Sequence, residues 1–210
     1  IDNKSNRTHI YNLFSRENCS LFSKVFFINS PRFHIGWSKI TLSLSEAVLM
    51  KAAIKYFGNS LYLSLHSESD YPLVPSKIIL DYLKRHYPNN FLAINNNSYL
   101  PQWKLDRPNF FRLSNQIKKK KKIMKVINYL FPNRKFRTID WKFGSNWFTM
   151  TVRDSRKIIE KMRENTFFVD FLEYSIISDE NLFQTLAVES NITTVGNTHR
   201  YIDWTTNDGH

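Results

Sequence analysis

Two adjacent acids, Asp179 and Glu180, are the residues of this sequence best suited to acid–base chemistry. They stand in the segment 178–181, whose small polar residues are typical of a helix start, and an apolar stripe follows them. A carboxylate fixed at a helix start could take a proton from a nucleophile in a cleft. The alternative is structural, because acids in a first helical turn also complement the positive end of the helix dipole. Taken alone, these two residues favour the structural interpretation.

Aromatic and acidic side chains beside polar loops form a second group of candidates. Trp37, Trp147 and Trp204 could stack on a sugar or a nucleobase, although a single Trp more often packs in a core. The loop 67–70 has a Glu-x-Asp spacing that could bind a divalent metal. The six histidines have no metal-ligand spacing, and the five glycines form no phosphate-cradling loop. For Cys19, a structural or exposed thiol is favoured over a nucleophile.

The formal net charge of +12 indicates an anionic partner. Nucleic acid, acidic lipid and the diphosphate of a nucleotide sugar all meet that description. The run from Lys118 to Lys122 looks like a nucleic-acid patch, yet no nucleic-acid-binding motif accompanies it. We interpret the run as a solvated surface that could contact an anionic membrane or polymer, and we expect no nucleic acid among the partners.

The elements that must position these residues alternate between strand and helix. The predicted strands cover residues 25–28, 61–65 and 147–152. The predicted helices cover residues 40–54 with an end near Gly58, residues 76–83, a segment around 158–162, and a segment that begins at Ser178. This alternation predicts a single α/β domain over residues 1–210 with a mainly parallel central sheet. The stretch from about 89 to 140 breaks the rhythm and is interpreted as a variable insertion or a partner-facing subdomain.

In open α/β sheets, ligands bind beyond the carboxyl ends of the strands. Three polar segments are expected at that edge: the loop 67–70, the loop 144–146 and the turn into Asp179 and Glu180. This shared placement is the main physical pointer to a site. The lone cysteine excludes an internal disulfide and favours a reducing cytosol.

Six segments in a fixed order then carry a resemblance to a known family. They are residues 1–5, 36–38, 67–73, 144–148, 178–185 and 200–204. Together they resemble the core-2/I-branching β-1,6-N-acetylglucosaminyltransferase family, which includes the peptide O-xylosyltransferases. The patterns that match include Ser-x-x-Asp-Tyr-Pro-Leu, Gly-Ser-x-Trp, Asp-Glu-x-x-x-x-Thr and Arg-Tyr-Ile-x-Trp.

The resemblance implies a GT-A-like nucleotide-sugar transferase fold, an inverting single displacement and independence from metal. It implies that Glu180 is the base that deprotonates the acceptor hydroxyl. The residues implied for the nucleotide and donor sugar are Asp2, Lys4, Trp37, Ser69, Asp70, Gly144 and Ser145. Those implied for the acceptor glycan are Trp147, Asp179, Arg200 and Trp204. A UDP-sugar, with GlcNAc or xylose, is the donor substrate, and no cofactor is expected.

Two departures from the family qualify these expectations. The family's diphosphate-binding cations lie beyond the 200–204 segment, and the chain stops at His210, so the resemblance implies truncation at both ends. Eukaryotic members are disulfide-bonded proteins of the Golgi lumen, and the lone Cys19 favours a bacterial, cytoplasmic relative instead. Contact with an anionic membrane is expected separately, from the lysine run. The alternatives are an inactive carbohydrate-binding module on a decayed transferase fold and, ranked lower, a nucleic-acid-binding protein.

Overall fold

A computed structural model describes residues 26–36, 39–67, 70–95, 99–100, 126, 129–130, 139–175 and 178–201. Within them lies a four-stranded sheet in the order β1-β3-β2-β4. The strands are β1 (Tyr62–Ser64), β2 (Asn90–Leu92), β3 (Phe148–Thr151) and β4 (Thr194–Val195). The α-helices are α2 (Ile40–Phe57), α3 (Ser76–Arg85), α6 (Val152–Glu164), α7 (Phe167–Glu173) and α8 (Leu182–Glu189), and the 3₁₀ turn η5 (Ser178–Glu180) precedes α8.

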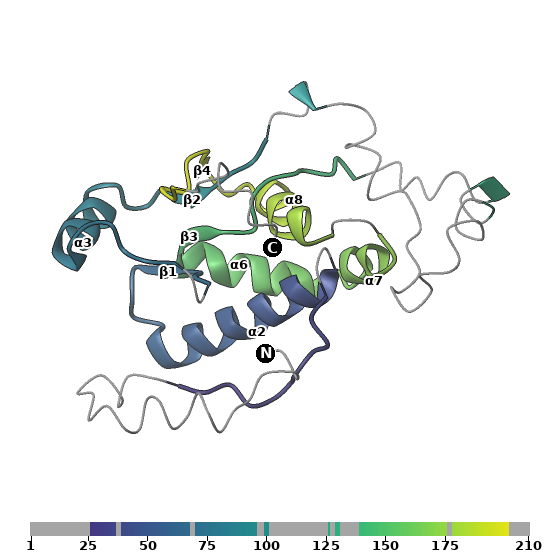
Figure 1. The fold of residues 1–210 in the computed structure, drawn as a ribbon, viewed down its shortest axis with the longest axis horizontal. Coiled ribbons are helices and arrows are strands. Elements are labelled where there is room, and N and C mark those ends of the chain that lie inside the picture. Colours follow the sequence, from purple (N-terminus) through teal and green to yellow (C-terminus); the bar gives the residue numbers. More distant parts are fainter. Residues whose placement is uncertain are drawn as a thin grey trace.

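The sheet is mixed, which corrects the prediction of a mainly parallel one. Strand β3 runs antiparallel to both β1 and β2, and β4 runs parallel to β2. The connection through α3 does leave β1 and β2 pointing the same way, as the strand–helix–strand alternation predicts. The two are not neighbours, however, because β3 lies between them (Figure 1). Alternation along the chain fixes strand direction but not which strands pair.

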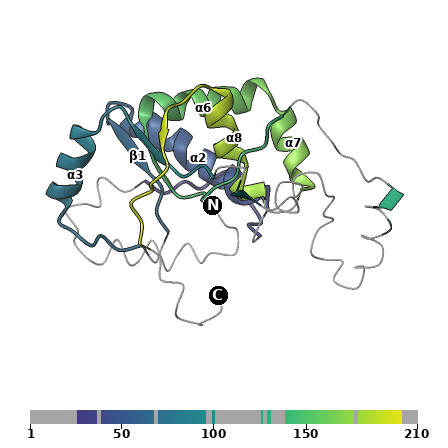
Figure 2. The same ribbon diagram turned by 90° about the horizontal axis from the view of Figure 1, so that it is seen from above.

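Helix α6 packs on β1 and β3, α2 and α8 pack against α6, and α7 packs against α2 and α8, whereas α3 stands apart beside β1 (Figures 1 and 2). Their shared core contains the large apolar side chains of the sheet and helices. Phe148 of β3 meets Phe183 of α8 edge-on with ring centroids 5.4 Å apart. Trp141 stacks on Phe171 of α7 with centroids 5.3 Å apart. Leu92 of β2 and Ile158 of α6 are fully buried in the same core.

Local sequence explains where two of these helices begin and end. The Thr151 hydroxyl accepts a hydrogen bond from the Asp154 N–H at 3.1 Å, which caps the start of α6. Helix α2 is a continuous helix-forming run that buries Ile40, Ala47 and Met50 and stops at Gly58. No helix in the described part of the chain is both long and apolar enough to cross a membrane.

The predicted elements are confirmed except at two places. The predicted strand 25–28 is wrong over its described residues, which form no strand. Phe26 instead lies against the end of α2, where its ring stacks on Tyr56 at 4.3 Å. The helix expected from Ser178 begins at Leu182, because residues 178–180 form a tighter 3₁₀ turn.

Three short elements were not predicted: β2, α7 and β4. Strand β2 stands at the beginning of the stretch from about 89 to 140 that was interpreted as an insertion, and it lies inside the central sheet. Most of that stretch lies outside the described residues, so its role stays a prediction.

Candidate functional site

Several polar segments meet at the edge of the sheet where β1 and β2 end. Because β3 is antiparallel to both strands, its amino end lies at this same edge. The Leu65 N–H donates to the Phe148 carbonyl at 3.0 Å, and the Asn95 N–H donates to the Phe143 carbonyl at 2.7 Å. The loop 144–147 is therefore held between the chain leaving β1 and the chain leaving β2. In open α/β sheets, ligands bind beyond the carboxyl ends of strands, which is where β1 and β2 end here.

Gly144 allows an unusually close approach of two backbones at this edge. A Cβ atom at this position would lie 1.9 Å from the Ala93 carbonyl oxygen, so no other residue fits without a backbone shift. The Gly144 N–H donates to the Glu180 carbonyl at 3.1 Å. The glycine thus joins the end of β2 to the η5 turn that carries Asp179 and Glu180.

Buried side chains reinforce the same junction. Asn181 Nδ2 donates to the Lys142 carbonyl at 3.0 Å, and the Lys142 N–H donates to Thr185 Oγ1 at 3.0 Å. Gln184 Nε2 donates to the Ser145 carbonyl at 2.7 Å. Asn181, Gln184 and Thr185 are completely buried, so these bonds form in a low-dielectric environment that strengthens them. The segment 142–145 and the start of α8 are consequently fixed to each other.

The two acids of the η5 turn differ in exposure. Asp179 is buried, with 8% of its surface exposed, whereas Glu180 is half-buried. Among the described residues, none forms a hydrogen bond or ion pair with the Glu180 carboxylate, whose backbone is nevertheless held by Gly144. A carboxylate with a fixed backbone and no bonding partner could serve as a general base.

A third acid, Glu46 of α2, lies against this turn and was missed by the sequence analysis. It is 3% exposed, and its Oε1 accepts a hydrogen bond from Asn146 Nδ2 at 3.1 Å. Burial raises the pKa of Glu46 to about 8, and the negative charge of Asp179 adds to this, while the Asn146 bond works in the opposite direction. The available signal was an acid flanked by the apolar residues of a buried helix face.

Arg200 contacts both the loop after β1 and the ring of Trp147. Its Nη2 donates to the Leu65 carbonyl, its Nε lies 3.7 Å from Asp70 Oδ2, and its guanidinium stands 5.6 Å from the centre of the Trp147 ring. Asp70 Oδ2 also accepts a bond from the Ser67 N–H at 2.8 Å. Burial lowers the pKa of Arg200, and the charge of Asp70 opposes that effect. This arrangement orients Trp147 and the loop after β1 toward each other.

The structure therefore gathers seven of the residues named from the sequence around one loop. They are Asp70, Gly144, Ser145, Trp147, Asp179, Glu180 and Arg200. Their individual roles stay predictions. The other predicted site residues, together with the lysine run, lie outside the described part of the chain. These are Asp2, Lys4, Trp37, Ser69, Trp204 and Lys118 to Lys122.

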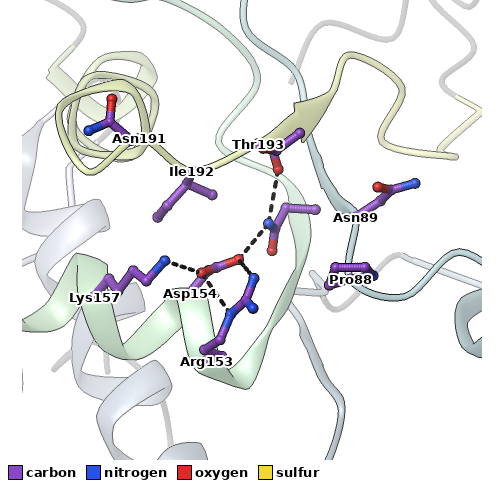
Figure 3. A pocket seen from close by; sticks show the side chains of 9 residues that line it. Pro88, Asn89, Arg153, Asp154, Lys157, Asn191, Ile192 and Thr193 are labelled. Atoms are coloured by element: carbon purple, nitrogen blue, oxygen red, sulfur yellow. Dashed lines mark hydrogen bonds and ion pairs between the residues drawn. The ribbon is translucent and has the colours of Figure 1, made fainter.

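The opposite edge of the sheet carries a different polar cluster, in a cavity of about 190 Å³ (Figure 3). Asp154, with 3% of its side chain exposed, accepts bonds from Asn90 Nδ2 at 2.9 Å and Thr151 Oγ1 at 3.1 Å. Arg153 and Lys157 both point at its carboxylate, at 3.2 and 2.9 Å (Figure 3). Burial alone would raise the pKa of Asp154, but these donors outweigh it and hold that pKa well below its usual range.

Asp154 and its donors join β2, β3 and α6 to one another. Asn90 Nδ2 extends the network by also donating to the Thr193 carbonyl at 3.0 Å, next to β4. The carboxylate is fully engaged, so this cluster has the properties of a structural anchor and not of a reactive site.

Metal binding was considered for the loop after β1. In the described part of the chain, no group of three or more His, Cys, Asp or Glu side chains is placed to hold a metal ion. Glu68, the other acid of the Glu-x-Asp spacing, lies outside that part. Metal independence of the reaction stays a prediction.

Comparison with known protein families gives one result that covers the chain. The family described as Core-2/I-Branching enzyme matches residues 2–210. A search of curated proteins finds no match for this chain.

Proposed function

The chain belongs to the Core-2/I-branching enzyme family, a family of glycosyltransferases, and from this premise we propose a specific reaction for it. The protein transfers a sugar, GlcNAc or xylose, from a UDP-sugar to a hydroxyl group of a glycan or similar acceptor. The transfer is a single displacement that inverts the anomeric carbon, with no metal and no cofactor. Glu180 is the catalytic base.

The observation that carries this proposal is that the backbone of Glu180 is held by a hydrogen bond while its side chain is unpaired within the described residues. Its backbone carbonyl is tied to Gly144 at the carboxyl edge of the sheet, while its half-buried side chain has no ion pair or hydrogen bond within the described residues. Asp154, at the opposite edge of the sheet, shows that this fold surrounds an acid with donors where the acid is structural. The contrast supports a catalytic role for Glu180 over the helix-dipole role that its sequence position alone favours.

The chemistry of the step needs one base and a stabilised leaving group. As the acceptor oxygen bonds to the anomeric carbon, its proton passes to Glu180. The bond from that carbon to the UDP oxygen breaks, and its electron pair leaves with UDP. A correctly placed general base contributes about 10²- to 10⁴-fold to such a step.

The surrounding residues divide between the two substrates. Asp70, Gly144 and Ser145 lie on the side of the edge formed by the β1 loop and the start of β3, which suits the donor. The indole of Trp147 offers a flat face for an acceptor sugar, and Arg200 holds that ring in place. Asp179 is buried, so we assign its effect on the acceptor side to the turn that it shares with Glu180.

A donor screen with the full-length protein tests the proposed reaction. UDP-GlcNAc and UDP-xylose are supplied with excess EDTA, UDP release is measured, and the anomeric configuration of the product is read by NMR. Turnover in EDTA with inversion is expected. Turnover that needs a divalent metal, or retention of configuration, would contradict the proposed mechanism. Sugar binding without turnover would indicate a carbohydrate-binding module instead.

A further inference from the structure

Glu46 is a buried acid whose position the proposed reaction does not by itself explain. It is the one charged-type side chain that α2 buries, beside the apolar Ile40, Ala47 and Met50 and the small polar Ser43 and Ser45. Its Oε1 accepts from Asn146 at 3.1 Å, and its Oε2 is buried with no hydrogen-bond partner in the described structure. An acid in such a place lowers stability unless it is neutral. Its position therefore points to a role other than packing.

The contacts of Glu46 lead to Glu180 by two routes. Through Asn146 it reaches the loop whose Gly144 N–H holds the Glu180 carbonyl. More directly, α2 contacts the η5 turn, and the charge of Asp179 acts on Glu46 across that contact. Glu46 thus forms a hydrogen bond with the 144–146 loop and lies within electrostatic reach of Asp179 in the η5 turn.

We propose that Glu46 is a positioning residue of the transfer reaction, which holds the 144–146 loop and the η5 turn in the register that places the Glu180 carboxylate. This proposal rests on the proposed function for the role of Glu180, but the geometry that it describes can be measured without any turnover. Glu46 acts through Asn146 and the turn, and it touches neither donor nor acceptor.

The role requires Glu46 to be uncharged. A neutral acid accepts the Asn146 bond and sits beside Asp179 without repulsion, whereas a carboxylate would bury a second negative charge against the turn. Among the described residues of the elements packed on α2, Asp179 is the titratable group whose charge acts on Glu46. Ser43 of α2 and Ser178 of η5 are also fully buried, and neither hydroxyl has a hydrogen-bond partner in the described structure.

Three variants of the full-length protein test the proposal. Glu46→Leu removes the acceptor for Asn146. Glu46→Gln keeps an acceptor oxygen with no charge. Met50→Ala is the matched control, because Met50 is buried one helical turn further along α2 and destabilises the fold on truncation without touching Asn146. Each variant is examined at pH 6 by hydrogen–deuterium exchange of peptides covering 142–147 and 178–185, and by UDP release from the donor sugar.

Glu46→Leu is expected to raise hydrogen–deuterium exchange in both peptides and to lower kcat roughly ten- to a hundredfold. The donor KM should change little, because displacing the base disturbs the geometry of the reaction and not the binding of the donor. Glu46→Gln is expected to restore both readouts, and Met50→Ala should lower the melting temperature without this pattern. Unchanged exchange in Glu46→Leu, or no rescue by Glu46→Gln, would overturn the proposal. If the exchange pattern is found but the wild-type protein turns over neither UDP-sugar, the proposed function fails while the positioning role of Glu46 stands.

Discussion

Asp154 and Glu46 are two buried acids at opposite edges of the same sheet, and their surroundings shift their pKa values in opposite directions. Both are about 3% exposed. Asp154 receives four donors and its pKa lies well below the usual range, whereas Glu46 receives one, faces another acid, and has its pKa raised to about 8. Surface exposure is similar in the two cases, and the donors and neighbouring charges act in opposite directions on the two pKa values.

The comparison separates a structural edge from a candidate reactive edge. At the Asp154 edge the side chains of Asn90, Thr151 and Asp154 bond to one another and hold β2, β3 and α6 together. At the other edge, Glu46 Oε2 and Arg200 Nη1 are buried without hydrogen-bond partners in the described structure. Unsatisfied polar groups lower stability, and proteins retain them where a site needs them.

Removing the structural acid should produce the largest loss of stability. Asp154→Ala leaves the buried groups of Asn90 and Thr151 without their acceptor, although Arg153 and Lys157 can turn to solvent. We expect a loss of about 2–4 kcal/mol in the free energy of unfolding by urea titration. A loss below that of an exposed substitution such as Glu160→Ala would show that this edge is not the anchor.

Disturbing the reactive edge through Gly144 should cost less stability but more activity. In Gly144→Ala the added methyl group meets the Ala93 carbonyl, so one backbone must move. We expect about 1–3 kcal/mol of destabilisation, typical of overpacking, together with a fall in UDP release per folded molecule. Gly196→Ala is the control, since a Cβ there meets nothing within 4 Å. If Gly144→Ala and Gly196→Ala had the same stability and the same UDP release, the close approach of Gly144 to Ala93 would be contradicted.

The charge of Glu46 gives a pH test in which the two edges respond differently. Because the folded-state pKa of about 8 exceeds the ordinary 4.5, the folded state keeps a proton that the unfolded state releases. The contribution of Glu46 to the free energy of unfolding is therefore complete below pH 4.5. It declines as the pH rises to about 8, by on the order of 1 kcal/mol per pH unit.

Glu46→Gln removes that decline, so the variant should be more stable than wild type at pH 8 and show little advantage at pH 4. Asp154→Asn should not gain stability at either pH. Urea unfolding of both variants at the two pH values decides the matter. A Glu46→Gln variant that is no more stable at pH 8 would show that Glu46 is charged in the folded protein.

The pair of Asp70 and Arg200 should have the smallest effect on stability. The distance of 3.7 Å and the 28% exposure of the Asp70 side chain make it a weak, partly solvated ion pair. Asp70→Asn keeps an acceptor for the Ser67 N–H, and we expect a change in stability below about 1 kcal/mol. The donor KM should nevertheless rise. A large loss of stability with unchanged KM would place Asp70 with the structural residues.

The sequence predicted the longer elements of this fold and not its pairing. Apolar periodicity was sufficient for α2, α3 and α6, and for strands β1 and β3. Strands β2 and β4, with three and two residues, are too short to carry a period. The insertion of β3 between β1 and β2 depends on long-range contacts that local sequence does not encode.

The candidate site was predicted in part for the same reason. Short motifs placed Asp70, Gly144, Glu180 and Arg200 in the sequence, and the fold brings them to one edge. Glu46 was missed because an acid on a helix is ordinarily on the surface. Only the packing of α2 against η5 shows that it is buried next to Asp179.

The central claim, that Glu180 is the base of a sugar transfer at this edge, is tested most directly by the turnover of Glu180→Gln. Glu189→Gln is the matched control, because Glu189 is an exposed glutamate at the far end of α8. With a donor that the wild-type protein turns over, we expect Glu180→Gln to lower kcat by about 10²- to 10⁴-fold, while UDP affinity and the kcat of Glu189→Gln stay near wild type. Full activity of Glu180→Gln would contradict the account.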